Sequence, residues 1–365
     1  MGDVMSGQYA PRAETVVDLD ALRHNVALLA ERAQVPVMAV VKADGYGHGA
    51  VPIAKAALEA GATWLGSASA TEAVDLRKAG IEAPILAWLY APGEDLSDAV
   101  AAGVDLGVSS VDELRAADGA RLHLKIDTGL NRNGCSPEDW PELVKAARDH
   151  DVHAIWSHLA SADEPGNPSI DRQAGRFDEA YEIAVAEGLQ PIRHLANSAA
   201  TLTRPDLAYD MVRVGIAMYG LNPVPQHEDL RPVMTFRSSV VSTKRTPAGE
   251  GVSYGHTWVA DRDTTLALVP VGYADGVPRG LSGRFEVSLA GQRRPVVGRV
   301  CMDQIVVDCG DDPVSPGDEV ILFGPGAHGE PTAREWADKL GTIDYEIVTN
   351  MYRPRVRRRY VGASS

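Results

Sequence analysis

Five groups of polar residues follow short apolar runs in the first 220 residues. Lys42 ends one such run and precedes a loop that contains three glycines. The other groups are Lys125 to Arg132, His158, Asn197 with Ser198, and Arg213 with Gly215 and Ile216. A lysine can form a Schiff base, a serine beside backbone N–H groups can hold a phosphate, and an arginine can donate to a ring nitrogen or a carboxylate. Pyridoxal phosphate is the cofactor that uses all three kinds of group.

Three interpretations of the segment around Lys42 remain open on its residues alone. Gly45 to Ala50 fits the dinucleotide-binding pattern G-x-G-x-x-G/A, although three residues separate the expected strand from the first glycine. A solvated loop lysine is the ordinary alternative. The third interpretation places Lys42 at the carboxyl end of a strand, where α/β folds carry their chemistry. The four other groups favour this third interpretation.

Short apolar runs alternate with Ala-rich amphipathic segments up to about residue 220. The expected strands are 37–42, 64–67, 85–88, 104–108, 122–127, 152–158, 192–197 and 212–218, and helical patterns between them include 51–60, 70–79, 111–117, 140–149 and 172–186. Eight strands that alternate with helices predict a (β/α)₈ barrel of the TIM type, over residues 14–240. A functional group at the end of such a strand faces the catalytic end of the barrel.

The pattern changes after about residue 230 to short strands with turn signals between them. The expected strands are 234–243, 264–271, 285–289, 294–300, 304–308 and 319–323. They predict a separate, mostly β domain formed by residues 1–13 and 241–365. The basic segment 353–359 is interpreted as a C-terminal strand with solvated, ion-paired arginines. The fold class is therefore α/β plus β.

Composition excludes several classes of partner. The net charge of −15 argues against nucleic acid or an anionic membrane. No run approaches membrane-spanning length, and the first residues lack the apolar core of a signal peptide. Cys135, Cys301 and Cys309 match no metal-site spacing, so we expect no metal and reduced thiols in a cytoplasmic protein.

A competing motif lies in the expected β domain. Gly251 to Gly255 matches G-x-S-x-G, which is typical of the nucleophile elbow of serine hydrolases. An elbow needs a strand before the serine and a helix after it. Turn-rich residues precede this motif and no helical period follows it, so a hydrolase is disfavoured.

In chain order, eight segments together resemble the alanine racemase family over nearly the whole sequence. They are VKADGYGHG (41–49), KIDTGLNR (125–132), SHLASAD (157–163), ANSAA (196–200), RVGIAMYG (213–220), GVSYG (251–255), VGYADG (271–276) and GRVCMDQ (298–304). The resemblance implies a barrel followed by a β domain, with pyridoxal phosphate as cofactor. It implies interconversion of L-alanine and D-alanine, which supplies D-alanine for cell-wall peptidoglycan. It also implies head-to-tail homodimers in which the partner's β domain completes each active site.

The resemblance also assigns roles to single residues. It implies that Lys42 holds the cofactor and acts as a base on one face, with Tyr254 of the partner subunit as the base on the other. Arg213 would donate to the pyridine nitrogen with His158 behind it, and because arginine keeps its proton the electron sink should be weak. The other implied residues are Tyr46, Asn197, Ser198, Gly215, Ile216 and Tyr352 for the cofactor, Arg132 for the cofactor and substrate, Met302, Asp303 and Tyr273 for the substrate, and Lys125 as a carbamate site.

One segment departs from the family pattern. The family has a phosphate-binding tyrosine directly before Arg-Val-Pro-Arg, whereas residues 350–358 read NMYRPRVRR. Arg357 replaces the proline, and Tyr352 is the tyrosine carried over.

Three alternative functions remain. A racemase of broader specificity would act on serine or larger side chains. A non-catalytic pyridoxal-phosphate carrier would lack the β domain and any equivalent of Tyr254. A decarboxylase on the same plan would be expected to have an acidic group where Arg213 stands.

Overall fold

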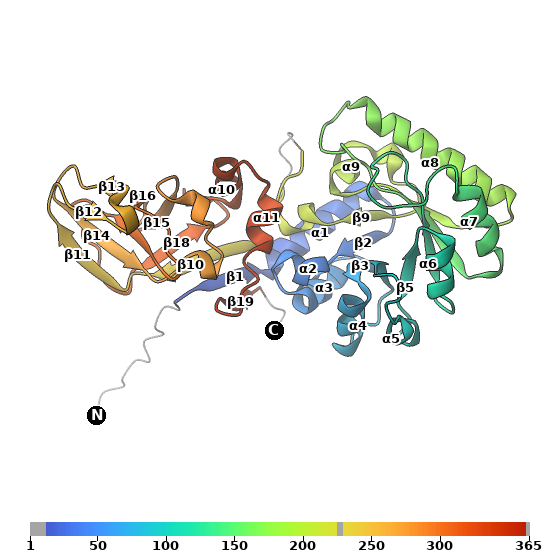
Figure 1. Cartoon of the computed structure of the whole chain (residues 1–365), viewed down its shortest axis with the longest axis horizontal. Helices are drawn as coiled ribbons and strands as arrows, with labels where there is room; N and C mark the ends of the chain where they lie inside the picture. Colours follow the sequence, from blue (N-terminus) through green and yellow to red (C-terminus); the bar gives the residue numbers. More distant parts are fainter. Residues whose placement is uncertain (1–11, 225–228, 363–365) are drawn as a thin grey trace. The chain divides into compact units, whose positions relative to one another are not determined.

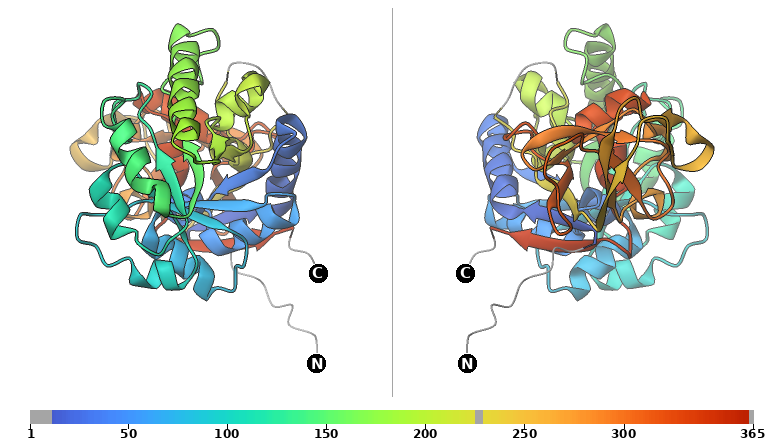
Figure 2. Two further views of the ribbon diagram at one scale, coloured as in Figure 1. Left: turned by 90° about the vertical axis from the view of Figure 1, so that its right-hand side faces the viewer. Right: turned by 90° about the vertical axis from the view of Figure 1, so that its left-hand side faces the viewer.

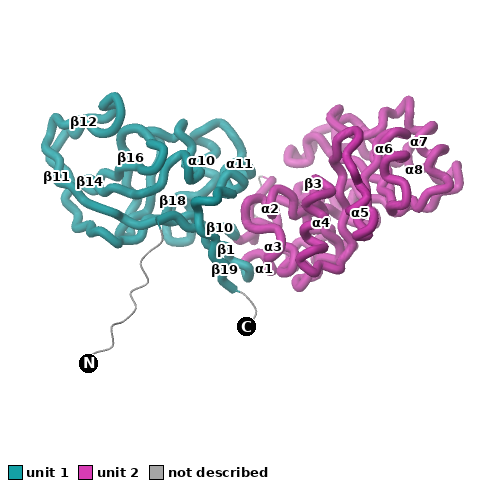
Figure 3. The backbone as a smooth tube through the Cα atoms, turned by 60° about the horizontal axis from the view of Figure 1, so that its bottom comes forward, with its two compact units in different colours: residues 1–20, 232–365 teal, residues 21–231 magenta. Residues whose placement is uncertain are grey.

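The computed structural model describes residues 12–224 and 229–362, which form two compact units (Figure 3). The barrel unit covers residues 21–231, and the β unit covers the remainder of the described chain. This division differs from the predicted boundaries at residues 14 and 240. Strands β1 (Glu14–Asp18) and β10 (Met234–Ser239) pair with each other and belong to the sheet of the β unit. Residues 1–11 of the predicted β domain lie outside the described residues.

Eight parallel strands form the centre of the barrel unit (Figure 1). They are β2 (Val37–Val40), β3 (Trp64–Ser69), β4 (Ile85–Leu89), β5 (Asp105–Val108), β6 (Leu122–Lys125), β7 (Val152–Trp156), β8 (Ile192–His194) and β9 (Val212–Val214). Consecutive strands pair from β2 to β8, and β9 returns to pair with β2. The N–H groups of Asp210 and Arg213 donate to the carbonyls of Arg193 and Ala196, which connects the last two strand segments. The predicted barrel is confirmed.

Helix α1 (Leu19–Ala33) precedes the first barrel strand, and the other helices of the barrel unit follow its strands. They are α2 (Lys42–Tyr46), α3 (Ala50–Glu59), α4 (Ala70–Lys78), α5 (Ser97–Ala101), α6 (Val111–Ala116), α7 (Trp140–Ala146), α8 (Pro168–Ala186) and α9 (Ser198–Thr203), with 3₁₀ turns η1 (Ala147–Asp149), η2 (Pro205–Leu207) and η3 (Ile216–Tyr219). The left view of Figure 2 shows the blue helix α1 and the green helix α8 outside the strands. Polar N-caps such as Ser69, Ser110 and Asn167 begin three of them. No helix in the described ranges is long and apolar enough to cross a membrane.

The β unit is built on a nine-stranded sheet with the order β11-β14-β17-β16-β15-β18-β10-β1-β19. Besides β1 and β10, its strands are β11 (Ser242–Thr246), β14 (Thr264–Val269), β15 (Glu286–Leu289), β16 (Gln292–Val297), β17 (Ile305–Asp308), β18 (Glu319–Phe323) and β19 (Arg357–Val361). Strands β12 (Gly251–Val252) and β13 (Trp258–Val259) form a separate ribbon, and the helical segments are α10 (Ala333–Leu340), α11 (Asp344–Thr349), η4 (Tyr254–His256), η5 (Tyr273–Asp275) and η6 (Arg279–Leu281). The mostly β domain is confirmed, and β19 confirms a strand in the basic segment.

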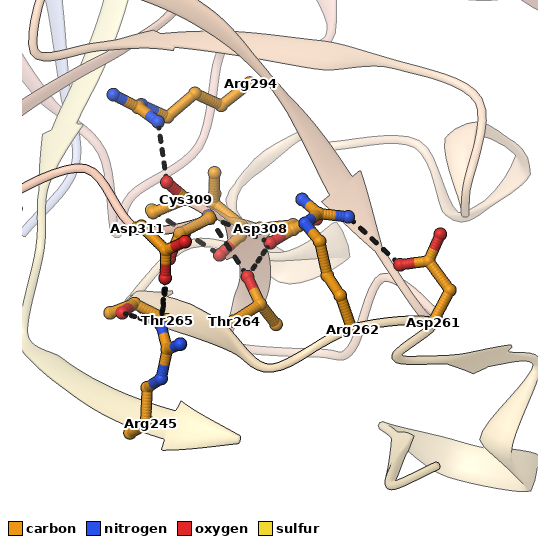
Figure 4. Close-up of polar contacts among 11 residues, drawn as sticks. Arg245, Asp261, Arg262, Thr264, Thr265, Arg294, Asp308, Cys309 and Asp311 are labelled. Atoms are coloured by element: carbon orange, nitrogen blue, oxygen red, sulfur yellow. Dashed lines mark hydrogen bonds and ion pairs between the residues drawn. The ribbon is translucent and has the colours of Figure 1, made fainter. Parts of the chain in front are cut away.

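A buried polar cluster ties β14 to the turn after β17 (Figure 4). Asp308 accepts hydrogen bonds from the hydroxyl of Thr264 and from Arg262. The Arg294 guanidinium is buried and donates to the carbonyls of Leu289 and Cys309, each at 3.0 Å. Each buried polar group in the cluster therefore has a partner, as burial demands.

Candidate active site

The chain leaves β2 in a left-handed turn that carries Lys42. Ala43, Asp44, Gly45 and Tyr46 all have φ between 50° and 61°. This conformation costs roughly 1–2 kcal/mol for each residue other than glycine. Side-chain hydrogen bonds offset that cost, because Asp44 accepts the N–H of Ala50 at 2.8 Å and Glu72 accepts the N–H of Ala43 at 2.7 Å. The segment after Lys42 is thus a braced turn rather than a flexible glycine loop.

The amine of Lys42 lies in a half-buried, aromatic setting. Its Nζ atom is 5.8 Å from the centroid of the Tyr46 ring and 6.0 Å from that of Trp88. Burial, and secondly the charge of Arg132, lower the pKa of Lys42, while the charge of Glu72 acts in the opposite direction. A lowered pKa makes the neutral amine, which is the nucleophilic form, more available near neutral pH.

Arg213 lies in the barrel interior with most of its donors already used. Nη1 donates to the carbonyl of His194 at 2.7 Å and to its Nδ1 atom at 3.0 Å. Nη2 donates to the carbonyls of Ser157 and Leu195, and to Nδ1 of His158 at 3.3 Å. Burial lowers the pKa of Arg213 to about 9, which still leaves it charged near neutrality. Within the described residues no group accepts from its Nε–H, so this donor remains for an external acceptor.

A second cluster of donors lies where β8 and β9 end. The hydroxyl oxygen of Ser198 accepts the N–H groups of Gly215 at 2.9 Å and Ala217 at 3.3 Å, so the hydroxyl proton is left to donate elsewhere. A Cβ atom at Gly215 would lie 2.6 Å from the Tyr46 hydroxyl oxygen, so any larger residue there would displace Tyr46. Ile216 begins η3, and its N–H has no acceptor inside that helix. Such convergent donors suit a phosphate.

Asn197 is placed beside this cluster as a helix cap. Its side-chain oxygen accepts the N–H of Ala200 at 3.1 Å and begins α9. That contact orients Ser198, the first residue of the helix.

Lys125, Arg132 and His158 complete the barrel side of the site. Lys125 ends β6, and its Nζ atom lies 4.5 Å from the centroid of the Trp156 ring. Burial, followed by the charges of Arg213 and Arg132, lowers the pKa of Lys125 to about 8. Burial and Arg213 also hold the pKa of His158 well below its ordinary value. Because the charge of Arg132 acts on Lys42, Lys125 and His158 alike, the exposed Arg132 lies near all three.

The predictions from sequence assign no role to Glu72 or His194. Glu72 follows the N-cap Ser69 by three residues in a capping box, a motif that would have marked it as a bracing residue. His194 ends the short strand β8 and contacts Arg213 directly. Only the register of the barrel strands brings that pair together.

The β unit gathers its own predicted site residues on neighbouring loops. The N–H of Tyr273 donates to the carbonyl of Cys301, directly before Met302. Ser253 directly precedes Tyr254, and its hydroxyl oxygen lies 3.4 Å from the Cys301 sulfur. Asp303 pairs with Arg355 at 2.6 Å. The side-chain amide of Asn350 donates to Gly276, which brings the chain before Tyr352 to the same group of loops.

We call this set of exposed side chains, Tyr254, Tyr273, Met302 and Tyr352, the aromatic loop cluster. Their exposed fractions are 72%, 40%, 52% and 61%. The Arg358 guanidinium lies 5.9 Å from the centroid of the Tyr352 ring. Groups of exposed large apolar side chains are typical of surfaces that bind another molecule.

Ser253 lacks the surroundings of a hydrolase nucleophile. A two-residue strand, β12, precedes it, and a 3₁₀ turn followed by β13 comes after it in place of an α-helix. Its hydroxyl donates to the carbonyl of Arg299 at 3.0 Å. The prediction against an elbow is therefore confirmed by the local fold.

Two family models match the two units in turn. The alanine racemase N-terminal domain matches residues 17–223, and the alanine racemase C-terminal domain matches residues 233–360. The chain belongs to the alanine racemase family. An alanine racemase from Thermobifida fusca is 56% identical and aligns over 96% of this chain and 98% of its own length. The resemblance seen in the motifs is confirmed, and so is the prediction that the chain is an enzyme, an alanine racemase.

Solved alanine racemases have the same fold. The enzyme from D-cycloserine-producing Streptomyces lavendulae has a TM-score of 0.94 and 48% identity, and the alignment covers 97% of this chain and 98% of that one. The alanine racemase from Bartonella henselae, described with covalently bound pyridoxal phosphate, has a TM-score of 0.87 and 29% identity, with coverage of 96% and 99%. In the described part of this racemase no group of three His, Cys, Asp or Glu side chains could hold a metal ion.

Proposed function

We propose that this enzyme racemises L-alanine and D-alanine with pyridoxal phosphate as cofactor, using Lys42 and Tyr254 of the partner subunit as its two bases. One observation carries the proposal. Lys42, the free Nε–H of Arg213 and the donors around Ser198 all lie at the carboxyl-terminal side of the barrel strands. They match an aldehyde, a ring nitrogen and a phosphate, the three groups of one cofactor.

The residues present fit that cofactor. Lys42 would hold its aldehyde, Arg213 its ring nitrogen, and Ser198, Ile216 and Tyr46 its phosphate. When bound, pyridoxal phosphate supplies an electron sink for negative charge on the substrate α-carbon. Arg213 would donate a hydrogen bond to the ring nitrogen without transferring its proton, so the ring nitrogen would stay unprotonated. This would weaken the sink and limit side reactions.

The two bases would divide the proton transfer between two faces. Racemisation removes the α-proton from one face and returns a proton to the other, so a single fixed base is not enough. Burial and Arg132 lower the pKa of Lys42, which supports proton acceptance by its amine. Tyr254 of the partner subunit would hold the proton on the opposite face. Arg132 would bind the substrate carboxylate, with Tyr273, Met302 and Asp303 of the partner subunit around it.

Lys125 suits the role of a carbamate. A lysine whose pKa is lowered to about 8 has a substantial neutral fraction near pH 7.5, and the neutral amine is the form that takes up CO₂. The carbamate would turn a positive charge into a negative one near Arg132. That change would orient the Arg132 guanidinium toward the substrate.

The exposure of the aromatic loop cluster supports a head-to-tail homodimer. Tyr254 is 72% exposed, which leaves it free to enter a partner's site. Tyr352 would join the phosphate contacts from the same cluster. We propose that the dimer acts in the cytoplasm and that its D-alanine serves peptidoglycan synthesis.

A chiral exchange assay tests the function. The purified enzyme with pyridoxal phosphate is incubated in D₂O with each common L-amino acid, and both enantiomers and α-deuterium are measured. D-alanine as the dominant product, with α-deuteration, is the expected result. Comparable D-serine or larger D-amino acids would indicate a broader racemase, and no exchange on any substrate would contradict catalysis. Lys42→Ala is the inactive control.

A further inference from the structure

Four buried polar side chains form a line across the interior of the barrel unit. They are Asp105 on β5, His123 on β6, His194 on β8 and Arg213 on β9, with exposed fractions of 3%, 0%, 0% and 5%. Barrel interiors are normally filled by branched apolar side chains. Buried polar groups reduce stability unless they are hydrogen-bonded, so a polar line here calls for a physical reason.

Each member of the line contacts the next at hydrogen-bonding distance. Oδ2 of Asp105 lies 3.0 Å from Nε2 of His123. Nδ1 of His123 lies 2.9 Å from Nε2 of His194. Nδ1 of His194 lies 3.0 Å from Nη1 of Arg213. We call these four residues the histidine chain.

The two ends of the histidine chain determine the direction of every bond in it. A guanidinium can only donate, so Nδ1 of His194 must accept from Arg213. A neutral histidine that accepts at Nδ1 carries its proton on Nε2, and His194 therefore donates to Nδ1 of His123. His123 in turn carries its proton on Nε2 and donates to Asp105, which only accepts when ionised. One assignment, with both histidines neutral and protonated at Nε2, satisfies all three bonds.

The surroundings agree with that assignment. Burial lowers the pKa of His123, and burial together with Arg213 holds the pKa of His194 well below its ordinary value. Arg121 pairs with Asp105 at 2.9 Å, and the His153 ring lies 5.3 Å from that of His123. Trp156 stacks on His194 with 5.6 Å between ring centroids. The charged and titratable groups around these four residues include Arg77, Arg121 and His153 at the Asp105 end, and His158 and Lys125 near Arg213 at the other end.

In the described ranges, His194 and His158 are the two side chains that accept from Arg213, and His194 is the one that continues through hydrogen bonds to a carboxylate. In the described ranges no carboxylate pairs with its charge, and its other acceptors are three backbone carbonyls and His158. Hydrogen bonds in series polarise one another in a low-dielectric interior. The carboxylate of Asp105 can thus stabilise the Arg213 charge through two neutral rings.

We propose that Asp105, His123 and His194 are positioning residues that fix the plane of the Arg213 guanidinium and keep its Nε–H directed out of the barrel. The part of this inference that concerns catalysis rests on the proposed function, in which Arg213 faces the cofactor ring. The direction of the chain stands on the contacts alone. Two histidine rings separate Asp105 from Arg213, so a residue that does not touch the cofactor would tune this donor.

A measurement on the unmodified holoenzyme tests the direction of the chain. Histidine is labelled with ¹⁵N, and the ring signals are assigned by single substitutions. We expect His123 and His194 both to be neutral with the proton on Nε2, unchanged between pH 6 and pH 9 (roughly the range in which ordinary histidines titrate). A proton on Nδ1 of either ring, or a charged ring, would overturn the proposal. This readout does not depend on activity, so it separates failure of the chain from failure of the proposed function.

Two matched variants test the positioning role. His123→Phe breaks the chain, whereas His153→Phe changes the neighbouring ring and leaves the chain intact. We expect His123→Phe to shift the visible absorbance of the bound cofactor and to lower kcat about tenfold or more with little change in KM, as loss of an orienting partner does. His123→Gln, which can still accept and donate, should recover part of the loss. Equal behaviour of His123→Phe and His153→Phe in spectrum and kcat would overturn the proposal.

If His123→Phe does not fold, Asp105→Asn replaces it. We then expect a smaller shift of the cofactor absorbance in the same direction, and no shift would count against the proposal.

Discussion

The backbone N–H of Ala43 donates to the carboxylate of Glu72 at 2.7 Å, which fastens the residue after Lys42 to the first turn of α4. The other carboxylate oxygen accepts the N–H groups of Ala68 and Ser69. One side chain therefore braces the left-handed turn that carries Lys42 and caps a helix. It also raises the pKa of Lys42 against the lowering effect of burial.

Replacing Glu72 should change both stability and the titration of Lys42. Glu72→Ala removes an acceptor for three N–H groups, and we expect a loss of about 2 kcal/mol in the free energy of unfolding. Loss of the carboxylate also lowers the pKa of Lys42, so covalent incorporation of pyridoxal phosphate into the apoenzyme should reach half its maximum at a lower pH. Thermal unfolding and absorbance titrations measure the two effects. Glu94→Ala, which removes the acceptor of one exposed N–H group, is the control. An unchanged or higher midpoint would contradict the role of Glu72.

A methyl group at Gly215 should damage the phosphate side of the site. In Gly215→Ala the new Cβ would lie 2.6 Å from the Tyr46 hydroxyl oxygen, so Tyr46 must move. We expect the dissociation constant for pyridoxal phosphate to rise about tenfold or more, which corresponds to about 1.4 kcal/mol. Tyr46→Phe removes the clashing oxygen, and the double variant should lose less than the sum of the single effects. Fluorescence titration of the apoenzymes measures this, and strict additivity would argue against the contact.

The buried amine of Lys125 should make stability depend on pH in the alkaline range. Its pKa falls from 10.5 to about 8 on folding, so between these values the unfolded chain binds more protons than the folded one. Stability then rises with pH, and the penalty present in full below about pH 8 is relieved toward pH 10.5. Relative to Lys125→Met, the wild type should gain up to about 3 kcal/mol across this window in CO₂-free buffer. Denaturant unfolding at several pH values measures the gain. If the free energy of unfolding of the wild type, relative to Lys125→Met, stays constant or falls as the pH rises, this prediction is contradicted.

Two arginines of the cluster in Figure 4 should differ sharply in their effect on stability. Arg294 is buried and satisfies two carbonyls and Asp312, so Arg294→Met should lower the free energy of unfolding by about 3 kcal/mol. Arg245 forms an exposed pair with Asp311, so Arg245→Met should lower it by less than about 1 kcal/mol. Thermal and denaturant unfolding of both variants provide the comparison. Similar losses from the two substitutions would contradict this difference in burial.

The barrel could be predicted from sequence because its parallel strands are buried on both faces. Such strands appear as nearly continuous apolar runs, as in β2, where all four residues are buried. Strand β1 was not predicted. Its partners β10 and β19 lie more than 200 residues after it in the sequence, and no local pattern specifies that pairing. Strands β12 and β13 have two residues each, which is too short for any period to show.

Candidate site residues could be proposed from sequence where the chemistry of a residue type suggests a role. Lys42 stands out because it ends an apolar run, Arg213 because it is the one charged residue between Met211 and Met218, and Ser198 because it follows the expected strand 192–197. The left-handed turn at Ala43, Asp44 and Tyr46 was not predictable, since local preference opposes it and contacts from α3 and α4 sustain it. The histidine chain was hidden for a related reason. His123 and His194 lie on different strands 71 residues apart, and only the register of β6, β8 and β9 aligns them.

Sharing of the active site between subunits is the central claim, and heterodimers of two inactive chains test it most directly. Lys42→Ala and Tyr254→Phe chains are co-expressed with different tags, and the mixed dimer is purified and assayed for alanine racemisation. If Tyr254 serves the partner's site, one of the two sites is intact and we expect about half of the wild-type activity. The reciprocal dimer, wild type with a Lys42→Ala/Tyr254→Phe chain, should then be inactive because each of its sites lacks one base. An inactive mixed dimer together with an active reciprocal dimer would contradict the account.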